Sequence, residues 1–408
     1  MPAIFPETAM FSLLSFVVLC LVGLAALYWY ALPLAALKPL GNLPEPVEPP
    51  VTRFAILLPA HDEAAVIAQT VERLRALRYP ADLYHIHIVA DHCSDDTATL
   101  ARQAGASVHE RNEGPRSGKG AALSWLLERV LQDESIQAVA VFDADTRVDA
   151  DFLRIMDAHM RRGVPVVQGE HIICNPGAGW FPSLTWAMFL VDNHYQNRGR
   201  VNLGFSAKHM GDSICFRADI LRSMGWGEGL TEDYQLRQRL LLQGIRILYD
   251  PRARGYGEAA PTWTAAQKQR LRWISGARRA GRQFAPQLIR EGLRRKDRAM
   301  LEGGMQAYLP SYSTLALVTL VLLGGQLISY QLWGVPARGL LFAWAGLGTL
   351  LFLYPFWGLA ARRAPLRAYL VMCSGTVFIL WRTWLALRVR IQRRAVSWVR
   401  TAHGDSST

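Results

Sequence analysis

Residues 137–145 read QAVAVFDAD, an apolar, strand-like run that ends in two aspartates separated by one residue. Two earlier runs have a similar form: residues 53–60 (RFAILLPA) end in Pro-Ala, and residues 84–91 (YHIHIVAD) end in aspartate. Helix-like patterns occupy residues 63–77, 95–105, 118–131 and 150–161. Strands that alternate with helices predict an α/β domain with a mainly parallel sheet covered on both faces.

Acidic residues stand where these strands are expected to end. Asp62 and Glu63 follow the first run, Asp91 ends the second, and Asp143 and Asp145 end the third. In a parallel sheet, ligands bind beyond the carboxyl ends of the strands. Each acid alone could be a helix cap or a turn former, and a single D-x-D pair is a weak signal. Together they predict a site for a hard divalent cation, which prefers oxygen ligands.

A glycine-rich, basic segment lies between the second and third runs. Residues 114–120 read GPRSGKG and open a predicted helix. Backbone N–H groups at a helix start, together with Lys119, favour a phosphate group. The segment is not a Walker A motif, because Gly120 stands where Ser or Thr is required. An ordinary surface loop is the alternative interpretation.

Two later motifs add acidic and basic groups. Thr231-Glu232-Asp233 begins a strongly helical run, and by itself could be a helix start in which Thr231 is the N-cap. Residues 267–284 read QKQRLRWISGARRAGRQF, which is basic with interleaved aromatics. As an alternative, this segment could be an amphipathic helix on anionic lipid.

The basic segment contains one cluster that suits a diphosphate. Gln269 and Arg272 are three residues apart and share a helix face, where Arg can bind a diphosphate bidentately. Trp273 is available to stack on a sugar ring.

Hydrophobic residues are concentrated near both ends of the chain. Residues 10–37 carry no charge and are long enough to span a bilayer. A signal peptide is the alternative, but the preceding residues lack a basic region and carry Glu7. Residues 312–333 and 340–361 are nearly charge-free and predict two more spans. Residues 368–381 are shorter and fit an interfacial or re-entrant segment, with a fourth crossing as the alternative.

Basic flanks predict the orientation of these spans. Residues 294–298 precede the second span and residues 362–367 follow the third, and both are rich in Lys and Arg. The positive-inside rule therefore places both flanks, and with them residues 38–305, in the cytoplasm. We expect a multi-pass protein of the cell (inner) membrane with four regions. These are an N-terminal transmembrane helix (10–37), a cytoplasmic domain (50–290), a C-terminal transmembrane region (305–388) and a basic cytoplasmic tail (389–408).

Composition and motifs exclude several other classes. The chain has 408 residues, 51% of them hydrophobic, and a formal net charge of +12. This content is too apolar for a mainly disordered chain. The five cysteines form no C-x-x-C pair, so neither a zinc site nor a disulfide framework is expected. A nucleic-acid binder is disfavoured because no zinc-finger spacing or RNA-binding aromatic motif is present. A transporter is disfavoured because the spans show no two-halved repeat.

Four motifs in order resemble those of the membrane-bound family-2 glycosyltransferases, which include cellulose, chitin, hyaluronan and poly-N-acetylglucosamine synthases. The motifs are Asp91, Asp143-Ala144-Asp145, Thr231-Glu232-Asp233 and Gln269-Arg270-Leu271-Arg272-Trp273. The likeness covers roughly residues 53–284 and the flanking spans. It implies a GT-A fold, a nucleotide-sugar donor, Mg²⁺ or Mn²⁺ as cofactor, and inversion at the anomeric carbon. A UDP-sugar is the family-level expectation for the donor.

The resemblance also implies roles for single residues. The nucleoside site would be lined by Pro59, Ala60, Glu63 and Asp91. Lys119 would face the diphosphate, while Asp143 and Asp145 would hold the nucleotide and the metal ion. Thr231-Glu232-Asp233 would be the catalytic motif, with Asp233 as the general base. Gln269, Arg272 and Trp273 would bind the diphosphate and the acceptor sugar. Trp398-Val399-Arg400-Thr401 loosely resembles a gating segment over the active site.

The predicted function is therefore sugar transfer to a growing polysaccharide at the inner face of the membrane. The chain departs from cellulose synthases in having fewer predicted spans. These spans would form only a narrower or partial conduit for a polysaccharide. The alternative is a transferase that adds a single sugar to a lipid-linked acceptor. Membrane lipid is an expected partner in either case, and nucleic acid is not.

Overall fold

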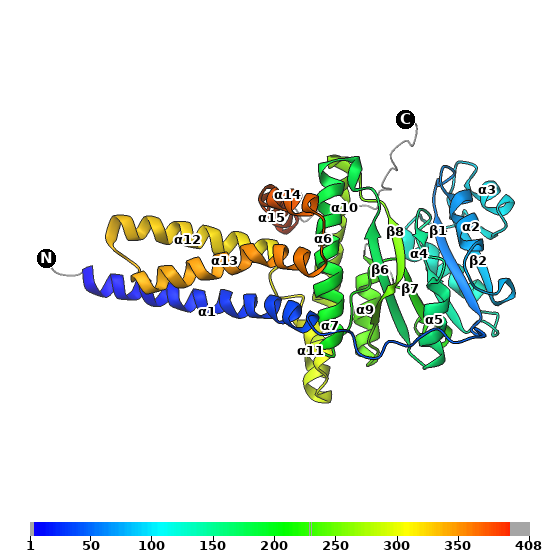
Figure 1. Ribbon diagram of the computed structural model, residues 1–408, viewed down its shortest axis with the longest axis horizontal. Coiled ribbons are helices and arrows are strands. Elements are labelled where there is room, and N and C mark those ends of the chain that lie inside the picture. Colours follow the sequence, from blue (N-terminus) through cyan, green and yellow to red (C-terminus); the bar gives the residue numbers. More distant parts are fainter. Residues whose placement is uncertain (1–3, 228, 230, 392–408) are drawn as a thin grey trace.

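The computed structural model describes residues 4–227, 229 and 231–391. Figure 1 shows a sheet domain with helices on both faces and a bundle of three long helices that extends away from it. Helix α6 (Trp180–Asp192) stands crosswise between these two parts. The predicted basic tail beyond Ile391, which includes the Trp398–Thr401 segment, lies outside the described residues.

One mixed sheet forms the core of the domain. Within the described residues its strand order is β3-β2-β1-β4-β7-β6-β8-β5. The strands are β1 (Phe54–Ala60), β2 (Tyr84–Asp91), β3 (Ser107–Arg111), β4 (Ala138–Val141), β5 (Arg147–Val148), β6 (Val166–Ile173), β7 (Ile214–Arg217) and β8 (Leu248–Gly257). Strands β1 to β4 pair in parallel, β7 is antiparallel to both β4 and β6, and β6 is parallel to β8. The predicted mainly parallel sheet is confirmed.

Both faces of the sheet are buried around β1 and β4, which are apolar at every position. Along β1, Phe54, Ile56 and Leu58 pack into one core cluster, whereas Ala55 and Leu57 pack into the other. The first face is covered by α2 (Ile67–Arg75), α3 (Thr97–Gln103) and α5 (Phe152–Arg161). The second is covered by α4 (Lys119–Val130), α8 (Ala218–Met224) and α9 (Glu232–Leu242).

A continuous rod joins the domain to the long helices. Helix α6 runs through a π-helical segment (Asn193–Gly199) into α7 (Arg200–Asn202). Two glycines permit close packing on this rod: a Cβ at Gly199 would lie 2.3 Å from the carbonyl oxygen of Leu32, and one at Gly358 would lie 2.9 Å from the side chains of Val191 and Tyr195. The rod therefore anchors both the first and the last of the long helices.

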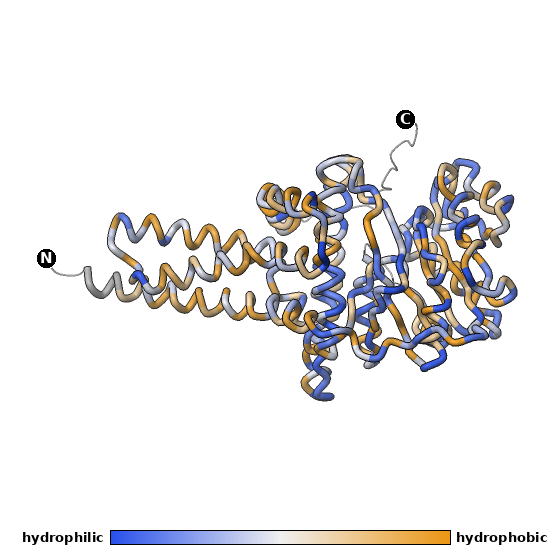
Figure 2. Tube along the Cα trace, in the orientation of Figure 1, coloured by the Kyte–Doolittle hydropathy of each residue, from blue (hydrophilic) through white to orange (hydrophobic). Residues whose placement is uncertain are grey.

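Among the residues that the structure describes, three helices are long and apolar enough to cross a membrane: α1 (Ile4–Ala36), α12 (Tyr312–Trp333) and α13 (Arg338–Ala361). Their apolar character along most of their length is visible in Figure 2. They coincide with the three predicted spans. The predicted interfacial segment 368–381 lies in two helices, α14 (Leu366–Cys373) and α15 (Gly375–Ile391), which are bent by 51° and form either a broken span or a re-entrant loop.

The remaining helices, α10 (Trp263–Arg295) and α11 (Arg298–Met305), pack on each other and on α9. Helix α10 contains the basic Q-x-x-R-W segment and continues through a short connection into α11. Two short turns, at Ala81–Leu83 and Pro176–Ala178, complete the described elements. The predicted boundary at residue 290 falls inside α10, and the division into four regions stays a prediction.

Candidate active site

The sheet topology brings distant loops to one edge. Strands β1, β2 and β4 are parallel, so their carboxyl ends meet, and Asp143 and Asp145 follow β4 directly. Strand β7 runs the opposite way and therefore begins at the same edge, preceded by Gly211 and Asp212. This geometry places four separate segments of polar residues around one position.

Lys119 connects several of these segments. It is the first residue of α4, and its ammonium donates to the carboxylate of Asp143 and, at 2.6 Å, to the carbonyl oxygen of Gly211. Burial alone would lower the pKa of Lys119, but the carboxylates of Asp143 and Glu232 outweigh it and raise that pKa. The lysine is therefore positively charged at neutral pH and lies between two acidic groups.

Glu232 and Asp233 form the first turn of α9. This turn packs closely against the start of α4, because two glycines lie at the contact. A Cβ at Gly120 would lie 2.8 Å from the Cβ of Glu232, and one at Gly227 would lie 2.2 Å from the carbonyl oxygen of Glu232. Both positions therefore require glycine for a close approach. The result is that the acidic pair stands beside Lys119, as the electrostatic effect of Lys119 on both carboxyls also shows.

The two acids of α9 have raised pKa values. Burial raises the pKa of Asp233, and burial followed by the charge of Asp233 raises the pKa of Glu232 to about 7. Lys119 and Arg272 oppose both shifts. Because the charge of Asp233 raises the pKa of Glu232, Asp233 ionises first, and Glu232 keeps its proton up to about pH 7. Asp233 is therefore the carboxylate of the pair that is available as a general base.

Helix α10 packs directly on this acidic turn. Gln269, Arg272, Trp273 and Gly276 follow the spacing of one helix face, and a Cβ at Gly276 would lie only 2.5 Å from the side chain of Thr231. The Thr231 side chain makes no capping hydrogen bond at the start of α9. Thr231 therefore occupies the N-cap position of α9, as the alternative interpretation expected, but its side chain does not cap the helix.

Arg272 is turned towards the acidic pair. It lowers the pKa of both Glu232 and Asp233, and its buried Nε has no hydrogen-bond partner among the described residues. Its neighbour Arg270 serves another purpose, because that guanidinium lies 4.8 Å from the Trp273 ring centroid and 5.9 Å from that of Phe181. Arg272 thus offers an unsatisfied donor to an anion at the site.

A buried pair that the sequence did not reveal lies next to the D-x-D. Nδ1 of His171, near the end of β6, is 2.6 Å from a carboxylate oxygen of Asp212, and Thr146 donates to the other oxygen at 2.9 Å. Burial would lower the pKa of His171, but Asp212 outweighs it and, with Asp143 and Asp145, raises that pKa. The turn Gly211-Asp212-Ser213 before an apolar run is a sequence signal for a strand start, but only the sheet order places Asp212 here.

The predicted nucleoside residues form a separate cluster around the loops after β1 and β2. Pro59 and Ala60 end β1, and the backbone N–H of Glu63 donates to the Thr97 hydroxyl at 2.7 Å. Asp91 ends β2, is only 4% exposed, and accepts a 2.5 Å hydrogen bond from Arg111. Arg111 also donates to the carbonyl oxygen of Pro115, so it ties Asp91 to the glycine-rich segment that leads to Lys119.

The residues at the D-x-D fit a hard divalent cation. Two carboxylates one residue apart stand at the sheet edge, and 43% of the Asp143 side chain is exposed. Mg²⁺ in proteins is commonly bound by one or two carboxylates together with the phosphates of the substrate. Asp143 and Asp145 would supply the carboxylates, and the neighbouring Lys119 indicates where the substrate phosphates would lie.

A different group of three ligand-type side chains occurs at the nucleoside end. Atoms of His61, Asp62 and Cys93 lie within 4.8 Å of one another. Asp62 already accepts two hydrogen bonds from Ser94, and burial raises the pKa of the Cys93 thiol. This group therefore suits a hard cation less well than the D-x-D does.

Comparison with known proteins gives a family match and several relatives. A family model described as glycosyl transferase family group 2 matches residues 138–391. The beta-monoglucosyldiacylglycerol synthase of a Synechocystis species is 28% identical over 264 residues, which cover 60% of this chain and 54% of that protein. The poly-beta-1,6-N-acetyl-D-glucosamine synthase of Staphylococcus epidermidis is 25% identical over 234 residues, which cover 55% of each protein. The chain spans about half the length of these curated relatives.

A solved structure shares the fold over nearly the whole chain. A mannosyltransferase from Pyrobaculum calidifontis in complex with GDP-Man and Mn²⁺ is 16% identical and has a TM-score of 0.56. The likeness covers 95% of this chain and 99% of that chain, so it includes helices outside the sheet domain.

Proposed function

The chain belongs to glycosyl transferase family group 2, and from that premise we propose that it transfers a sugar from a nucleotide-sugar donor to an acceptor hydroxyl at a membrane surface. The observation that carries the proposal is the junction at Lys119. Its ammonium binds Asp143 of the D-x-D and lies beside Glu232 of the acidic pair. A donor diphosphate and an acceptor hydroxyl would therefore meet at this position.

The residues support an inverting, single displacement. The acceptor oxygen attacks the anomeric carbon as the bond from that carbon to the diphosphate breaks, and Asp233 takes the hydroxyl proton. Lys119 and Arg272 stabilise the negative charge of the departing nucleoside diphosphate. A divalent cation held by Asp143 and Asp145 would neutralise further charge on the same group.

The remaining site residues have positioning roles in this proposal. Pro59, Ala60, Glu63 and Asp91 would hold the nucleoside, because they line the loops next to the glycine-rich segment. Gln269 and Trp273 would hold the acceptor, because they share a helix face with Arg272.

Two acceptor classes follow from the printed activities of the relatives, a growing polysaccharide and a lipid. They differ in product length. Synthesis on a defined acceptor should give a ladder of products for a polymerase and one added sugar for a lipid glycosyltransferase.

We also propose that the protein is a multi-pass protein of the cell membrane with its sheet domain in the cytoplasm. Three helices of the described part of the chain are long and apolar enough to span a membrane, and the segments before α12 and after α13 are rich in Lys and Arg.

The test is a panel of nucleotide sugars offered to the purified full-length protein with Mg²⁺ or Mn²⁺ and a membrane lipid extract. Release of nucleoside diphosphate from one donor, with UDP-sugars expected, would identify the substrate. Failure to release nucleotide from every donor, with and without lipid, would reject the proposed activity.

A further inference from the structure

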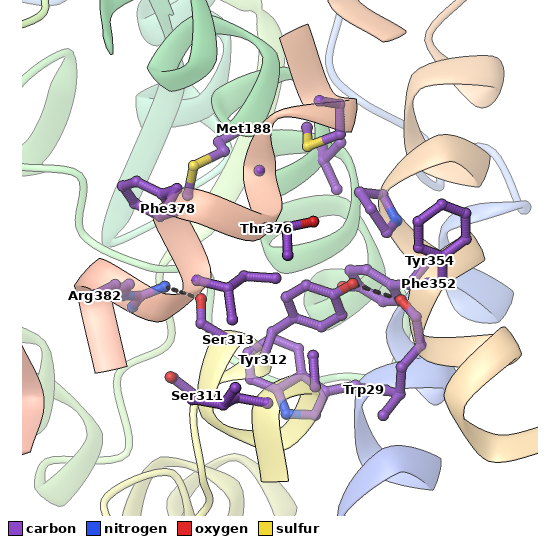
Figure 3. A pocket seen from close by; sticks show the side chains of 18 of the residues that line it. Trp29, Met188, Ser311, Tyr312, Ser313, Phe352, Tyr354, Thr376, Phe378 and Arg382 are labelled. Atoms are coloured by element: carbon purple, nitrogen blue, oxygen red, sulfur yellow. Dashed lines mark hydrogen bonds between the residues drawn. The ribbon is translucent and has the colours of Figure 1, made fainter. Parts of the chain in front are cut away.

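A cavity of about 240 Å³ lies where the long helices meet the sheet domain. Figure 3 shows side chains from α1, α6, α12, α13 and α15 converging on it. Most of its lining is apolar. Typical lining residues are Met188, Ala316, Gly348, Phe352, Phe378 and Ile379.

The cavity is open on the side that would face lipid. Three of its lining residues are exposed by half or more: Leu320 by 51%, Phe352 by 62% and Leu380 by 52%. They belong to α12, α13 and α15, of which the first two are candidate membrane spans. In a bilayer this opening would meet hydrocarbon, so an apolar chain could enter sideways without crossing water.

Another part of the cavity lining is charged. Lys208, Arg382 and Asp192 line it, and Arg382 donates to the hydroxyl of Ser313 at 3.2 Å (Figure 3). Among the described residues neither cation forms an ion pair within 4 Å. Two cations therefore face one carboxylate at the rim of a largely apolar space. This excess positive charge is complementary to a phosphate group, to which Arg can donate two parallel hydrogen bonds.

The charged part of the lining lies close to the catalytic groups. Lys208 precedes Gly211 by three residues, which limits their Cα separation to about 11 Å. The carbonyl oxygen of Gly211 accepts from Lys119, and a Cβ at Gly211 would lie 3.8 Å from a carboxylate oxygen of Asp233. On another side, the Arg270 guanidinium of α10 lies 5.6 Å from the ring centroid of Phe378.

We propose that this cavity binds a hydrocarbon chain of an anionic phospholipid, with the lipid phosphate between Lys208 and Arg382, and that a free hydroxyl of its headgroup is the sugar acceptor. The proposal rests on the function proposed above and names the acceptor class of the same site. The new bond joins the anomeric carbon to the headgroup oxygen, and the bond from that carbon to the diphosphate breaks. The hydroxyl proton goes to Asp233, and the nucleoside diphosphate leaves.

The test uses the purified full-length protein, the donor that releases most nucleotide, and three sets of vesicles. One set is phosphatidylcholine alone, the second adds phosphatidylglycerol, and the third adds the same amount of diacylglycerol. Phosphatidylglycerol carries both the phosphate and free hydroxyls, whereas diacylglycerol carries a hydroxyl without phosphate. We expect a sugar-bearing phospholipid only from the second set. Glycosylated diacylglycerol, or equal rates with all three, would overturn the proposal.

Two matched variants test the cavity itself. Gly348→Leu adds a large side chain at a position that lines the cavity, where a Cβ would meet its nearest neighbour at an ordinary 3.8 Å. Gly346→Leu is the control, since that glycine is exposed on the same helix with nothing within 4 Å. We expect Gly348→Leu to raise the KM for phosphatidylglycerol about tenfold or more while the donor KM stays unchanged. Equal lipid KM values for the two variants would reject the cavity as the lipid site.

Removal of the positive charge of Arg382 gives an independent test of the phosphate site. Arg382→Gln should weaken binding of phosphatidylglycerol vesicles about tenfold or more, and binding of phosphatidylcholine vesicles far less. Unchanged discrimination between the two would contradict a phosphate site. If nucleotide release proceeds normally on a soluble sugar acceptor while every lipid result is negative, this inference fails and the proposed glycosyltransfer stands.

Discussion

Gly276 of α10 lies so close to Thr231 of the T-E-D motif that a Cβ at Gly276 would be 2.5 Å from both the hydroxyl and the methyl group of the threonine. Real Cβ atoms essentially never approach so closely. This contact joins the helix that carries Arg272 to the turn that carries Asp233. The alignment of Arg272 with Asp233 therefore depends on the absence of a side chain at position 276.

We expect Gly276→Ala to lower kcat/KM by about 10–100-fold, because α10 must move away from α9 and small misplacements of reacting groups are costly. Steady-state nucleotide release measures the effect. Thr231→Ala removes both close atoms, so the double variant should recover part of the loss; purely additive losses would argue against the contact. Arg279→Ala, at an exposed position of the same helix, is the control and should be near normal.

The D-x-D assignment predicts metal dependence. Chelation should abolish nucleotide release, and Mg²⁺ or Mn²⁺ should restore it, because Asp143 and Asp145 offer only two carboxylates and the donor phosphates complete the coordination. Asp145→Asn should require more metal for half-maximal activity, which a metal titration measures. Full activity in excess chelator would remove the metal role from both residues.

The topology proposal predicts the sidedness of three points in the chain. Reporter fusions truncated after Lys38 should be cytoplasmic, and fusions after Trp333 should be external. A fusion after Val389 should be cytoplasmic if α14 and α15 form a re-entrant loop. An external reporter after Val389 would instead show that the bent pair crosses the membrane, which is the fourth span left open by its 51° bend.

Strands β1, β2 and β4 were predictable from sequence, because they are short apolar runs bounded by turn residues. Lys119, Asp143 and the T-E-D acids were likewise identified by motif, and the structure brings them together. The family membership expected from those motifs is confirmed by the family match. The role of each residue stays a prediction.

Strands β3 and β5 were not predicted, and neither were β6, β7 and β8, so the Asp212–His171 pair was missed. Strand β8 contains Pro251 and two arginines, and β6 mixes apolar residues with Gln168, Glu170 and His171, so neither has a clear strand pattern. Their pairing is fixed by long-range contacts. The position of Asp212 depends on β7 running antiparallel to β4, which no local pattern encodes.

The general-base proposal predicts a selective loss of chemistry at Asp233. Asp233→Asn keeps the size of the side chain and can still accept from the Tyr234 N–H, which Asp233 accepts at 2.7 Å. Its amide cannot take a proton at neutral pH, so kcat should fall about 10²-fold or more. Donor affinity, measured by direct titration, should stay within a few-fold.

Arg272→Ala gives the contrast to that variant. If the unsatisfied guanidinium binds the diphosphate, donor binding itself should weaken, in the same titration, by about tenfold or more. Near wild-type turnover in Asp233→Asn would show that the T-E-D motif only begins a helix. A charge near a helix N-terminus contributes only about 0.3–1 kcal/mol to stability.

The acidic pair also predicts the pH dependence of turnover. A base must be deprotonated to act, and burial, with the charge of Asp233, raises the pKa of Glu232 to about 7 while burial raises that of Asp233. The active form is thus lost as the pH falls through the raised pKa of Asp233, and kcat at saturating donor should decline about tenfold per unit below that pKa. The charge of Asp233 raises the pKa of Glu232, so Asp233 ionises first and Glu232→Gln should leave this acidic limb in place. A limb that disappears in Glu232→Gln would show that Glu232, and not Asp233, controls the profile.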